Sequence, residues 1–521
     1  MIDGRRKFDI CVAPSHKCSG MEINMNFICN FPFFSILLSL FSGTICSVLP
    51  AKAAKVVNRV VIIVVGLMSA VLLLYLLSTG ESFIYWMGHF PAPWGNEIRA
   101  GVLEAGMALF FCIIMYLSMA GGAHKLPGEV VESKHNLYYI LVNLLLSSLL
   151  ALVYTNDMFT AYVFVEINTI SACGLIMIRQ VGRTIEAAVR YMIMSLLGSG
   201  LLLFGLCIMY DLTGHLLMSN IKESVGLLIA NGEYQIPLIV SVALMCIGLC
   251  IKSALFPFHA WLPDAYGYST VSSAAILSSL VSKGYIFLLI KIIYRVIGFD
   301  IFNGTRIIDV LFVFGLMGMI FGSLSAIREN DIRRMIAYSS VAQIGYIYMG
   351  FGMGSQAGMV ASIFHILSHA ATKSLLFIAA IGLTDVSGGS RKFIDLTGAA
   401  YRNKWAGAAF TVGSLSMVGI PLFSGFISKL LFAQAAVQVE GKMLASLIVL
   451  GISTVLNAVY FMKTVIRIYA YAPDAPYKGI TFRDMKAYAV VLVCFILLNV
   501  ILGVSSQPVV DMIGQGLAMF A

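Results

Sequence analysis

Charged side chains stand within long apolar runs of this sequence, where burial makes a charge costly. They are Glu166, Lys252, Lys283, Lys373 and Lys429. An ionisable residue at the centre of a bilayer costs about 2.5 to 3.5 kcal/mol on insertion scales, so such residues are rare without a partner or a task. Residues that gain and lose protons at this depth predict proton transfer, alone or in exchange for another cation.

Glu166 needs a partner from another helix, because its own apolar run contains no basic residue. Lys252, near the end of a later run, is the natural candidate. Burial disfavours the charged form of a lysine and a nearby carboxylate favours it, so a movable Glu166 can switch the protonation of Lys252. A static structural ion pair is the alternative interpretation.

Polar residues share one face of the apolar run 357-384, because they recur at steps of three and four. They are Ser362, His365, Ser368, His369, Thr372 and Lys373. Histidine titrates near neutral pH, so such a face can hold water and pass protons. Structural histidines at a helix interface are one alternative. A metal site is another, although His365 and His369 lack the adjacent glutamate of an HExxH motif.

Lys283 shares one side of the apolar run 269-297 with Ser272 and Ser279. This arrangement predicts a second hydrated path. Serines alone would indicate only close helix packing, but a lysine among them favours a functional role.

Two apolar runs are interrupted by proline, at Pro257 and at Pro421. Proline removes a backbone hydrogen bond and breaks or kinks a helix. Broken helices at corresponding positions of two halves indicate ion sites in transporters built from inverted repeats. Each break has a lysine within eight residues, Lys252 in the first and Lys429 in the second, so ordinary proline kinks are the weaker interpretation.

The elements that position these residues are apolar runs long enough to cross a membrane. The chain is 60% hydrophobic and only 11% charged, whereas soluble domains carry about 25% charged residues. A spanning helix needs about 20 apolar residues, which predicts an all-α membrane protein of about fourteen transmembrane helices. The expected spans are 29-49, 57-77, 100-120, 136-155, 158-178, 187-210, 236-256, 269-297, 307-326, 333-353, 357-384, 405-434, 443-471 and 486-505.

The polar stretches between the runs are too short to form a separate soluble core. Residues 29-521 therefore constitute a single multi-pass membrane domain. Residues 1-28 form a leader or a mis-assigned start, with Met21 and Met25 as alternative first residues.

The distribution of cations predicts the orientation of the chain in the membrane. Apart from the first 28 residues, every Lys and Arg falls in a loop except Lys252, Lys283, Lys373 and Lys429. Loops after odd-numbered spans carry 20 Lys and Arg and loops after even-numbered spans carry 6. Since cytoplasmic loops are enriched in cations, the odd loops are cytoplasmic and both termini are non-cytoplasmic.

Two other classes of function are not supported. The net charge of +9 is spread over the loops without a basic, aromatic face for nucleic acid. The ten cysteines include no CxxC pair, and Cys246 and Cys250 are the closest two. Iron–sulfur and structural zinc sites need clustered thiolates, so we expect no metal and no redox cofactor bound by this chain.

Three blocks of the sequence resemble the antiporter-like subunits shared by Mrp-type cation/proton antiporters, respiratory complex I and membrane-bound hydrogenases. The similarity extends from about Glu104 to Lys429. Its most specific parts are Lys252-Ser253-Ala254 with Pro257, His259 and Trp261-Leu262-Pro263-Asp264-Ala265, then Asp331-Ile332-Arg333-Arg334 with Ala337-Tyr338-Ser339-Ser340-Val341-Ala342-Gln343-Ile344-Gly345, and finally His365, His369 and Lys373-Ser374-Leu375-Leu376-Phe377.

The resemblance implies two inverted five-helix repeats, about 136-297 and 307-471, each with a broken helix. It also implies roles for single residues. Glu166 matches the family's fifth-helix glutamate, Lys252 its seventh-helix lysine and Lys283 its eighth-helix lysine; His365, His369 and Lys373 match the eleventh-helix group and Lys429 the twelfth-helix lysine. Glu104 stands where many members have Asp.

The resulting hypothesis is proton translocation, as proton/cation antiport with Na⁺ as the candidate cation. The chain would act in the plasma or inner membrane with other membrane subunits of an Mrp-like complex, and it is most similar to the D-type members. The alternative is a proton-pumping membrane subunit of a complex I-like NADH dehydrogenase or an energy-converting hydrogenase. A degenerate member that serves only as a scaffold and has lost transport is disfavoured, because the set of buried charges is intact.

Overall fold

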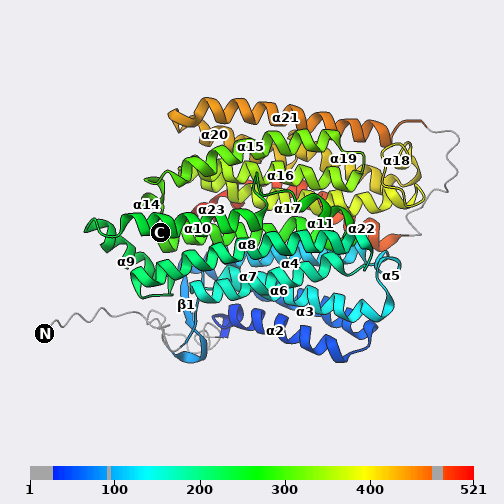
Figure 1. The fold of residues 1–521 in the computed structure, drawn as a ribbon. Coiled ribbons are helices and arrows are strands. Elements are labelled where there is room, and N and C mark those ends of the chain that lie inside the picture. Colours follow the sequence, from blue (N-terminus) through cyan, green and yellow to red (C-terminus); the bar gives the residue numbers. More distant parts are fainter. Residues whose placement is uncertain (1–26, 91–94, 472–484, 521) are drawn as a thin grey trace.

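Long helices run side by side through the whole molecule in the computed structural model, which describes residues 27–90, 95–471 and 485–520 (Figure 1). The predicted leader therefore falls almost entirely outside the described residues. A two-stranded antiparallel sheet pairs β1 (Phe83–Trp86) with β2 (Glu97–Ala100) at one end of the bundle. The prediction of an all-α membrane protein is confirmed.

Fourteen membrane crossings can be assigned within the described residues. Twelve helices are long and apolar enough by themselves. The helix α16 and the interrupted pair α19–α20 provide the other two. In order, the crossings are α2 (Phe31–Val48), α3 (Ala51–Thr79), α4 (Val102–Gly122), α6 (His135–Tyr154), α7 (Met158–Met177), α8 (Gly182–Thr213), α10 (Gln235–Ser253), α12 to η4 (Val271–Ile297), α15 (Ile307–Arg328), α16 (Ile332–Gly352), α17 (Gln356–Asp385), α19 (Lys404–Val418) with α20 (Ser424–Val437), α21 (Glu440–Ile468) and α22 (Lys486–Val504).

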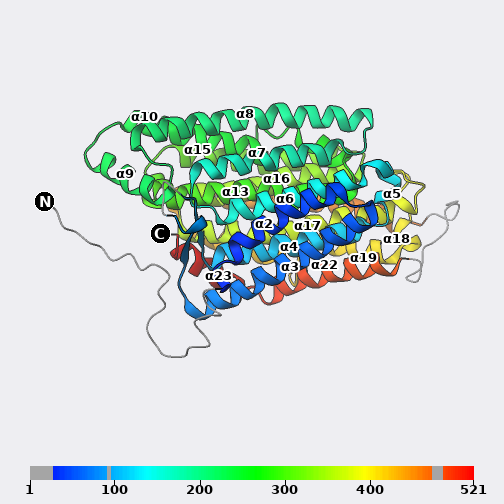
Figure 2. The same cartoon turned by 90° about the horizontal axis from the view of Figure 1, so that it is seen from below.

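Short elements lie mainly at the two ends of the bundle (Figures 1 and 2). Near the C-terminus are α9, α14 and α23, whereas α5 and α18 lie at the opposite end. Their bounds are η1 (Met87–His89), α5 (Leu126–Glu129), η2 (Glu132–Lys134), α9 (Met218–Ala230), α11 (Leu262–Tyr268), α14 (Phe299–Asn303), α18 (Ala399–Arg402) and α23 (Gln507–Ala518).

Two crossings form the interior of the bundle. In the most apolar 18-residue window of Val271–Ile297 and of α17, every residue is buried. The first of these crossings is a continuous helix assembled from α12 (Val271–Ile276), the π-helix η3 (Leu277–Val281), α13 (Ser282–Lys291) and the π-helix η4 (Ile292–Ile297). By contrast, α3, α8, α21 and α22 present apolar side chains outward, as expected where a helix contacts lipid tails. The helices that carry Lys283 and Lys373 are therefore the most deeply enclosed.

Close approach of helix backbones depends on glycine, as is common in membrane bundles. A Cβ atom added to Gly198 of α8 would lie 2.8 Å from the carbonyl oxygen of Gly248 in α10 and 3.1 Å from the Cγ of Lys252. Between α15 and α16, a Cβ on Gly345 would lie 2.6 Å from the carbonyl oxygen of Gly315. The glycines thus fix how closely α8 approaches the end of α10 that carries Lys252.

The two helix breaks begin before their prolines. The helix α10 ends at Ser253, and Ala254 has a φ of 63°; Pro257 follows in the non-helical connection to α11. Similarly, α19 ends at Val418 and Gly419 has a φ of 91°, with Pro421 inside the connection to α20. Because a residue in the left-handed region terminates a helix, these residues stop the helices and the prolines prevent their continuation.

Candidate functional site

The centre of the first half contains Glu166 on α7 and Lys252 in the last turn of α10. The Lys252 Nζ atom lies 3.6 Å from Glu166 Oε1, with the lysine fully buried and the glutamate 25% exposed. Lys252 Nζ also donates a hydrogen bond of 2.8 Å to Thr169 Oγ1, and the Ser199 hydroxyl of α8 donates to Glu166. The structure therefore brings together Glu166 and Lys252, as the sequence predicted. The hydroxyl groups of Thr169 and Ser199 share this contact.

A chain of hydrogen bonds continues from Thr169 into the bundle. The Thr169 hydroxyl lies 3.2 Å from the hydroxyl of Tyr285 on α13, and Tyr285 donates to Asn168 Oδ1 at 3.0 Å. Asn168 in turn donates to the Ser148 hydroxyl of α6 at 3.0 Å. Sequence reasoning missed Tyr285, which lies two residues after Lys283; a tyrosine in an apolar run gives no signal until a polar neighbour is known.

Lys283 lies at the junction of η3 and α13 and is completely buried. Its ammonium donates to the backbone carbonyl of Ser278. A π-helical turn has wider spacing than an α-helical one, which changes the register between Ser272 and Lys283. Ser279 lies 2.7 Å from the hydroxyl of Ser374 on α17, so it connects the eighth crossing to the eleventh.

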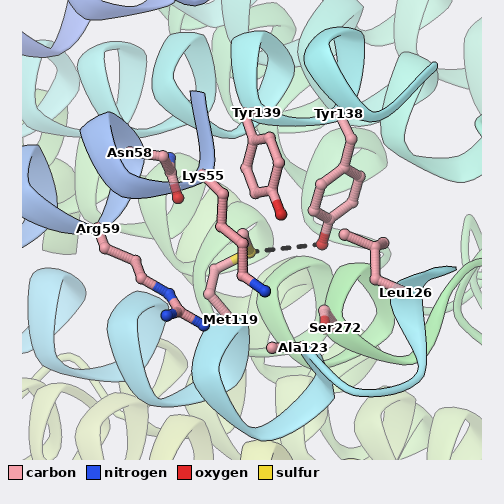
Figure 3. Close-up of a pocket in the computed structure, with 9 residues that line it drawn as sticks. All are labelled: Lys55, Asn58, Arg59, Met119, Ala123, Leu126, Tyr138, Tyr139 and Ser272. Atoms are coloured by element: carbon pink, nitrogen blue, oxygen red, sulfur yellow. Dashed lines mark hydrogen bonds between the residues drawn. The ribbon is translucent and has the colours of Figure 1, made fainter. Parts of the chain in front are cut away.

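Ser272 belongs to a different environment from Ser279. It lines a cavity of about 10 Å³ between α3, α4, α6 and α12, roughly the room that one water needs. Figure 3 shows the side chains around it, including the Tyr138 hydroxyl directed at Met119, 3.4 Å from its sulfur. The prediction that Ser272, Ser279 and Lys283 share one face depended on a regular α-helix. The π-helix η3 interrupts that regularity.

The imidazole rings of α17 are stacked in the interior. His365 and His369 have ring centroids 5.8 Å apart and planes that differ by 4°. His365 Nδ1 lies 2.5 Å from the Ser428 hydroxyl of α20. Its Nε2 atom and both ring nitrogens of His369 have no hydrogen-bond partner among the described residues. Buried polar atoms without partners are costly, so they indicate room for water beside the rings.

Lys373 lies one helical turn beyond His369. It donates at 2.9 Å to the carbonyl oxygen of Ile336 in α16 and also to the Ser339 hydroxyl. The other predicted residues of this face bond to neighbouring helices or to their own backbone. Ser368 donates to Ser424 at 2.8 Å, and Thr372 donates to Asn499 at 3.0 Å. Ser362 donates to the carbonyl oxygen of Gly358 at 2.8 Å and to that of Ile347 at 3.0 Å. Within the described ranges, no group of three or more His, Cys, Asp or Glu could hold a metal ion.

Lys429 lies beside the second helix break. Its Nζ donates at 2.7 Å to the carbonyl oxygen of Val418, the last residue of α19, and lies 5.9 Å from the ring centroid of Tyr346. The last carbonyls of a helix lack partners within it. The second break therefore supplies an acceptor for a partly buried ammonium. In the first half, the last turn of α10 carries Lys252.

The division of cations between spans and loops was wrong for two residues that lie inside the bundle. Lys291 and Arg295 are not in a loop: both are buried within Val271–Ile297. Arg295 Nη2 pairs with Glu104 Oε1 at 2.5 Å, and this ion pair across the bundle makes the interior position possible. Removing both residues from the count leaves 4 cations in the even loops rather than 6, so the charge asymmetry increases.

A larger cavity of about 360 Å³ enters the second half from the end of the bundle near α18. Met335, Tyr460 and Thr464 line it, together with the basic side chains of Lys392, Lys463 and Arg467. Met335 precedes Ile336, whose carbonyl accepts from Lys373. Space for water therefore extends to within one residue of a contact of Lys373.

Comparison with known proteins gives a consistent assignment. Residues 155–456 match the family described as NADH:quinone oxidoreductase/Mrp antiporter, TM. The N subunit of the NADH-quinone oxidoreductase of Desulforudis audaxviator is 32% identical over 79% of this chain and 79% of its own length. The D subunit of the Na(+)/H(+) antiporter of Alkalihalophilus pseudofirmus is 26% identical over 81% of this chain and 83% of its own length.

Solved structures agree with these relatives. A chain of the membrane-bound sulfane sulfur reductase, an archaeal respiratory membrane complex, superimposes with a TM-score of 0.85 and 26% identity, covering 94% of this chain and 97% of that one. A chain of the Mrp complex from Dietzia sp. DQ12-45-1b has the same fold, with a TM-score of 0.84 and 23% identity over 94% of this chain and 97% of that one. The resemblance read from the three sequence blocks is confirmed: the chain belongs to the NADH:quinone oxidoreductase/Mrp antiporter family of membrane subunits.

Proposed function

We propose that this chain translocates protons as one subunit of a multi-subunit membrane complex, through the buried residues from Glu166 to Lys429. The observation that carries the proposal is the set of three relay lysines enclosed in the bundle, Lys252, Lys283 and Lys373, together with Lys429, which is partly buried at the second helix break. Among the described residues, only Lys252 of these four has a carboxylate within 4 Å. A lysine that is buried without a counter-charge is easily neutralised, because burial disfavours its charged form. Lysines in this condition can exchange protons with neighbouring water.

The relay begins at Glu166 and Lys252. When Glu166 is close, the ammonium form of Lys252 is favoured; when Glu166 turns toward its exposed side, Lys252 releases its proton. Tyr285 and Thr169 offer hydroxyl groups next to Lys252. Lys283 is then the next basic group on the eighth crossing.

In the second half, His365, His369 and Lys373 continue the relay toward Lys429. Waters beside the unpartnered imidazole nitrogens would link groups that do not bond directly. Pro257 and Pro421 prevent the two broken helices from continuing. At the second break this leaves the carbonyl oxygen of Val418 to accept a hydrogen bond from Lys429. We regard residues 136-297 and 307-471 as inverted repeats that each contribute one half-channel.

Antiport of protons against Na⁺ or another cation is the preferred form of this activity. The similarity to the D subunit of the Na(+)/H(+) antiporter over four fifths of both chains supports it. The second candidate is a proton-pumping subunit of a redox complex, favoured by the higher identity to the N subunit of NADH-quinone oxidoreductase. In either case we propose that the chain itself binds no cofactor and that redox chemistry, if present, belongs to partner subunits.

Identification of the partners separates the two candidates. Proteins that copurify in mild detergent should be small membrane subunits if the complex is an antiporter, and iron–sulfur or flavin subunits if it is a redox pump. Orientation is part of the same proposal. The chain lies in the cell membrane, its cation-rich loops face the cytoplasm, and both termini lie on the opposite side.

The decisive test of the relay uses Glu166→Gln and Lys252→Met in the purified complex, reconstituted into vesicles that contain a pH-sensitive dye. Each variant should abolish coupled proton movement while remaining inserted and assembled, because either change uncouples the pair. Lys52→Met, at an exposed lysine of α3 that has no ion pair among the described residues, is the matched control. Wild-type transport by either relay variant would rule out the assignment.

A further inference from the structure

The buried cations missed by the sequence form a cluster toward the C-terminal end of the bundle. Lys291 ends α13 and Arg295 follows one turn later in the π-helix η4. Both are at most 2% exposed. Lys283 lies on the same helix, eight residues earlier, which is about 12 Å along the axis of an α-helix. Along this crossing, Lys291 therefore lies between Lys283 and the C-terminal end of the bundle.

Lys291 is held as an ammonium ion by its surroundings. Its Nζ donates to the carbonyl oxygens of Leu152, Val153 and Thr155, at 3.3 Å and 3.0 Å for the first two. These carbonyls lie at the C-terminus of α6, where backbone acceptors are unpartnered and the helix dipole is negative. An ammonium has three N–H groups, and three acceptors match them, whereas a neutral amine would leave one acceptor unpartnered. Three carbonyl acceptors at a helix C-terminus therefore distinguish Lys291 from the relay lysines and favour its charged form.

Glu104 balances the charge of Arg295, which leaves Lys291 without a carboxylate partner in the described part of the chain. The Arg295–Glu104 pair is neutral as a unit, and Glu104 also accepts a hydrogen bond from the backbone N–H of Gly101 at 3.1 Å. The cluster of Lys291, Arg295 and Glu104 thus carries a net positive charge. Two Arg295 nitrogens, Nε and Nη1, have no partner among the described residues.

Groups just outside the spans respond to the same positive region. On α9, burial together with Arg99 and Arg295 lowers the pKa of Lys222. Burial raises the pKa of Glu97 on β2, against smaller opposing contributions from hydrogen bonds and from Arg99 and Arg295. Arg99 is anchored by a 2.8 Å hydrogen bond to the carbonyl oxygen of Met519.

An apolar layer separates Lys283 from this cluster. Phe287, halfway between Lys283 and Lys291, is fully buried, and its ring centroid lies 6.1 Å from that of Phe520 in an edge-on contact. The Phe520 ring also lies beneath the Arg295 guanidinium, at 4.0 Å. The C-terminal segment after α23 therefore places an aromatic ring between the interior lysine and the end of the bundle.

We propose that Lys291, Arg295 and the Phe287–Phe520 ring pair form a seal that blocks protons and cations between Lys283 and the C-terminal end of the bundle. A fixed positive charge repels a cation, and an apolar ring pair leaves no acceptor for a proton; charged and apolar constrictions use the same physics in channels. The seal rests on the proposed function, since it prevents charge from escaping before it reaches the second half.

Passive proton leak tests the seal without any driving reaction. The complex is reconstituted into potassium-loaded vesicles with a pH-sensitive dye, and a potential is imposed with valinomycin. One unit charge at about 12 Å in an effective dielectric of about 20 changes a rate about tenfold. Lys291→Met should therefore raise the leak about tenfold, whereas Lys291→Arg, which keeps the charge, should stay near the wild-type leak. Lys52→Met is again the control.

Phe520→Ala provides an independent variant, because it removes the ring and leaves Lys291 in place. It should also raise the leak, and Phe520→Leu should restore the barrier by refilling the apolar layer. If Lys291→Met fails to assemble, the two Phe520 variants decide the question alone.

Three results would overturn the seal. The first is an unchanged leak in well-assembled Lys291→Met and Phe520→Ala. The second is loss of coupled transport with no leak, which would make Lys291 a relay residue. The third is an equal leak in Lys291→Arg or Lys52→Met, which would indicate general destabilisation. Failure of the relay itself is distinguishable, since wild-type transport by Lys252→Met would reject the relay and leave the leak measurements unaffected.

Discussion

The imidazole rings of His365 and His369 lie parallel on α17, with centroids 5.8 Å apart, and three of their four ring nitrogens lack a hydrogen-bond partner among the described residues. A direct hydrogen bond cannot bridge that separation. Proton transfer between the rings therefore requires water.

The first prediction concerns His369. His369→Ala should slow proton transport at least tenfold, because it removes the group between His365 and Lys373 and leaves a gap of more than one helical turn, about 5.4 Å. His369→Gln, which can still bond water, should fold as well as the wild type but transport less. Transport and thermal stability are measured on the same preparation.

The same measurements test the alternatives. Loss of stability with normal transport per folded molecule would make the histidines structural. Stoichiometric metal in the purified protein, together with inactivation by chelators, would indicate a metal site instead.

Thr169 offers a second prediction, on the Lys252 contact. Thr169→Val removes the hydroxyl that accepts from Lys252 at 2.8 Å. A hydrogen bond contributes about 0.5 to 1.5 kcal/mol, so transport should fall by roughly 2- to 10-fold, and Thr169→Ser should restore it. Equal transport by the valine variant would mean that Lys252 does not need this acceptor.

Gly198 tests whether helix spacing positions Lys252. Gly198→Ala should reduce stability by about 1 to 3 kcal/mol and reduce transport as well, since its Cβ would press on Gly248 and on Lys252. The matched control is Gly200→Ala on the same helix, because no atom lies within 4 Å of a Cβ at Gly200. Similar effects of both substitutions would contradict the packing argument.

Orientation can be measured by labelling engineered cysteines from one side of the membrane. Arg333, Arg334, Arg391 and Lys392 should face the cytoplasm, as the 20 Lys and Arg of the odd loops require. The predicted outward residue Ala521 lies outside the described residues, so Asp511 on α23 is the better reporter for that end. With the accessible native cysteines replaced, Lys392→Cys and Asp511→Cys should label from opposite sides.

The carboxyl group of Glu97 should make the stability of the folded protein depend on pH. Burial raises its pKa above the ordinary value of 4.5, so the folded state holds this proton more tightly than the unfolded state. The contribution of Glu97 is therefore most favourable at low pH and is lost as the pH rises through the folded pKa. Glu97→Gln, which can still accept from Asn156, should unfold at a higher temperature than the wild type at neutral pH. The difference should disappear below about pH 4, as followed by thermal unfolding in detergent.

The sequence alone determined the class of fold and the residues of the proposed relay. Apolar length is a local property, so the spans could be located to within a few residues, although the short helix α9, the sheet and the helix α23 were not expected. Ionisable residues in apolar runs are equally local, which is why Glu166, Lys252, Lys283, Lys373 and Lys429 were identified before their surroundings were known.

Tertiary structure decided what each charge contacts. Lys291 and Arg295 looked like loop cations because they stand at the end of an apolar run, and only the pairing with Glu104, 191 residues away in sequence, explains their burial. The serine face around Lys283 could not be predicted because η3 departs from α-helical spacing. The helix breaks were attributed to proline, but backbone conformation at Ala254 and Gly419 ends the helices, and a left-handed residue is invisible in composition when it is not glycine. Hydrogen-bond partners are set by contacts between distant segments, so no local pattern could supply them.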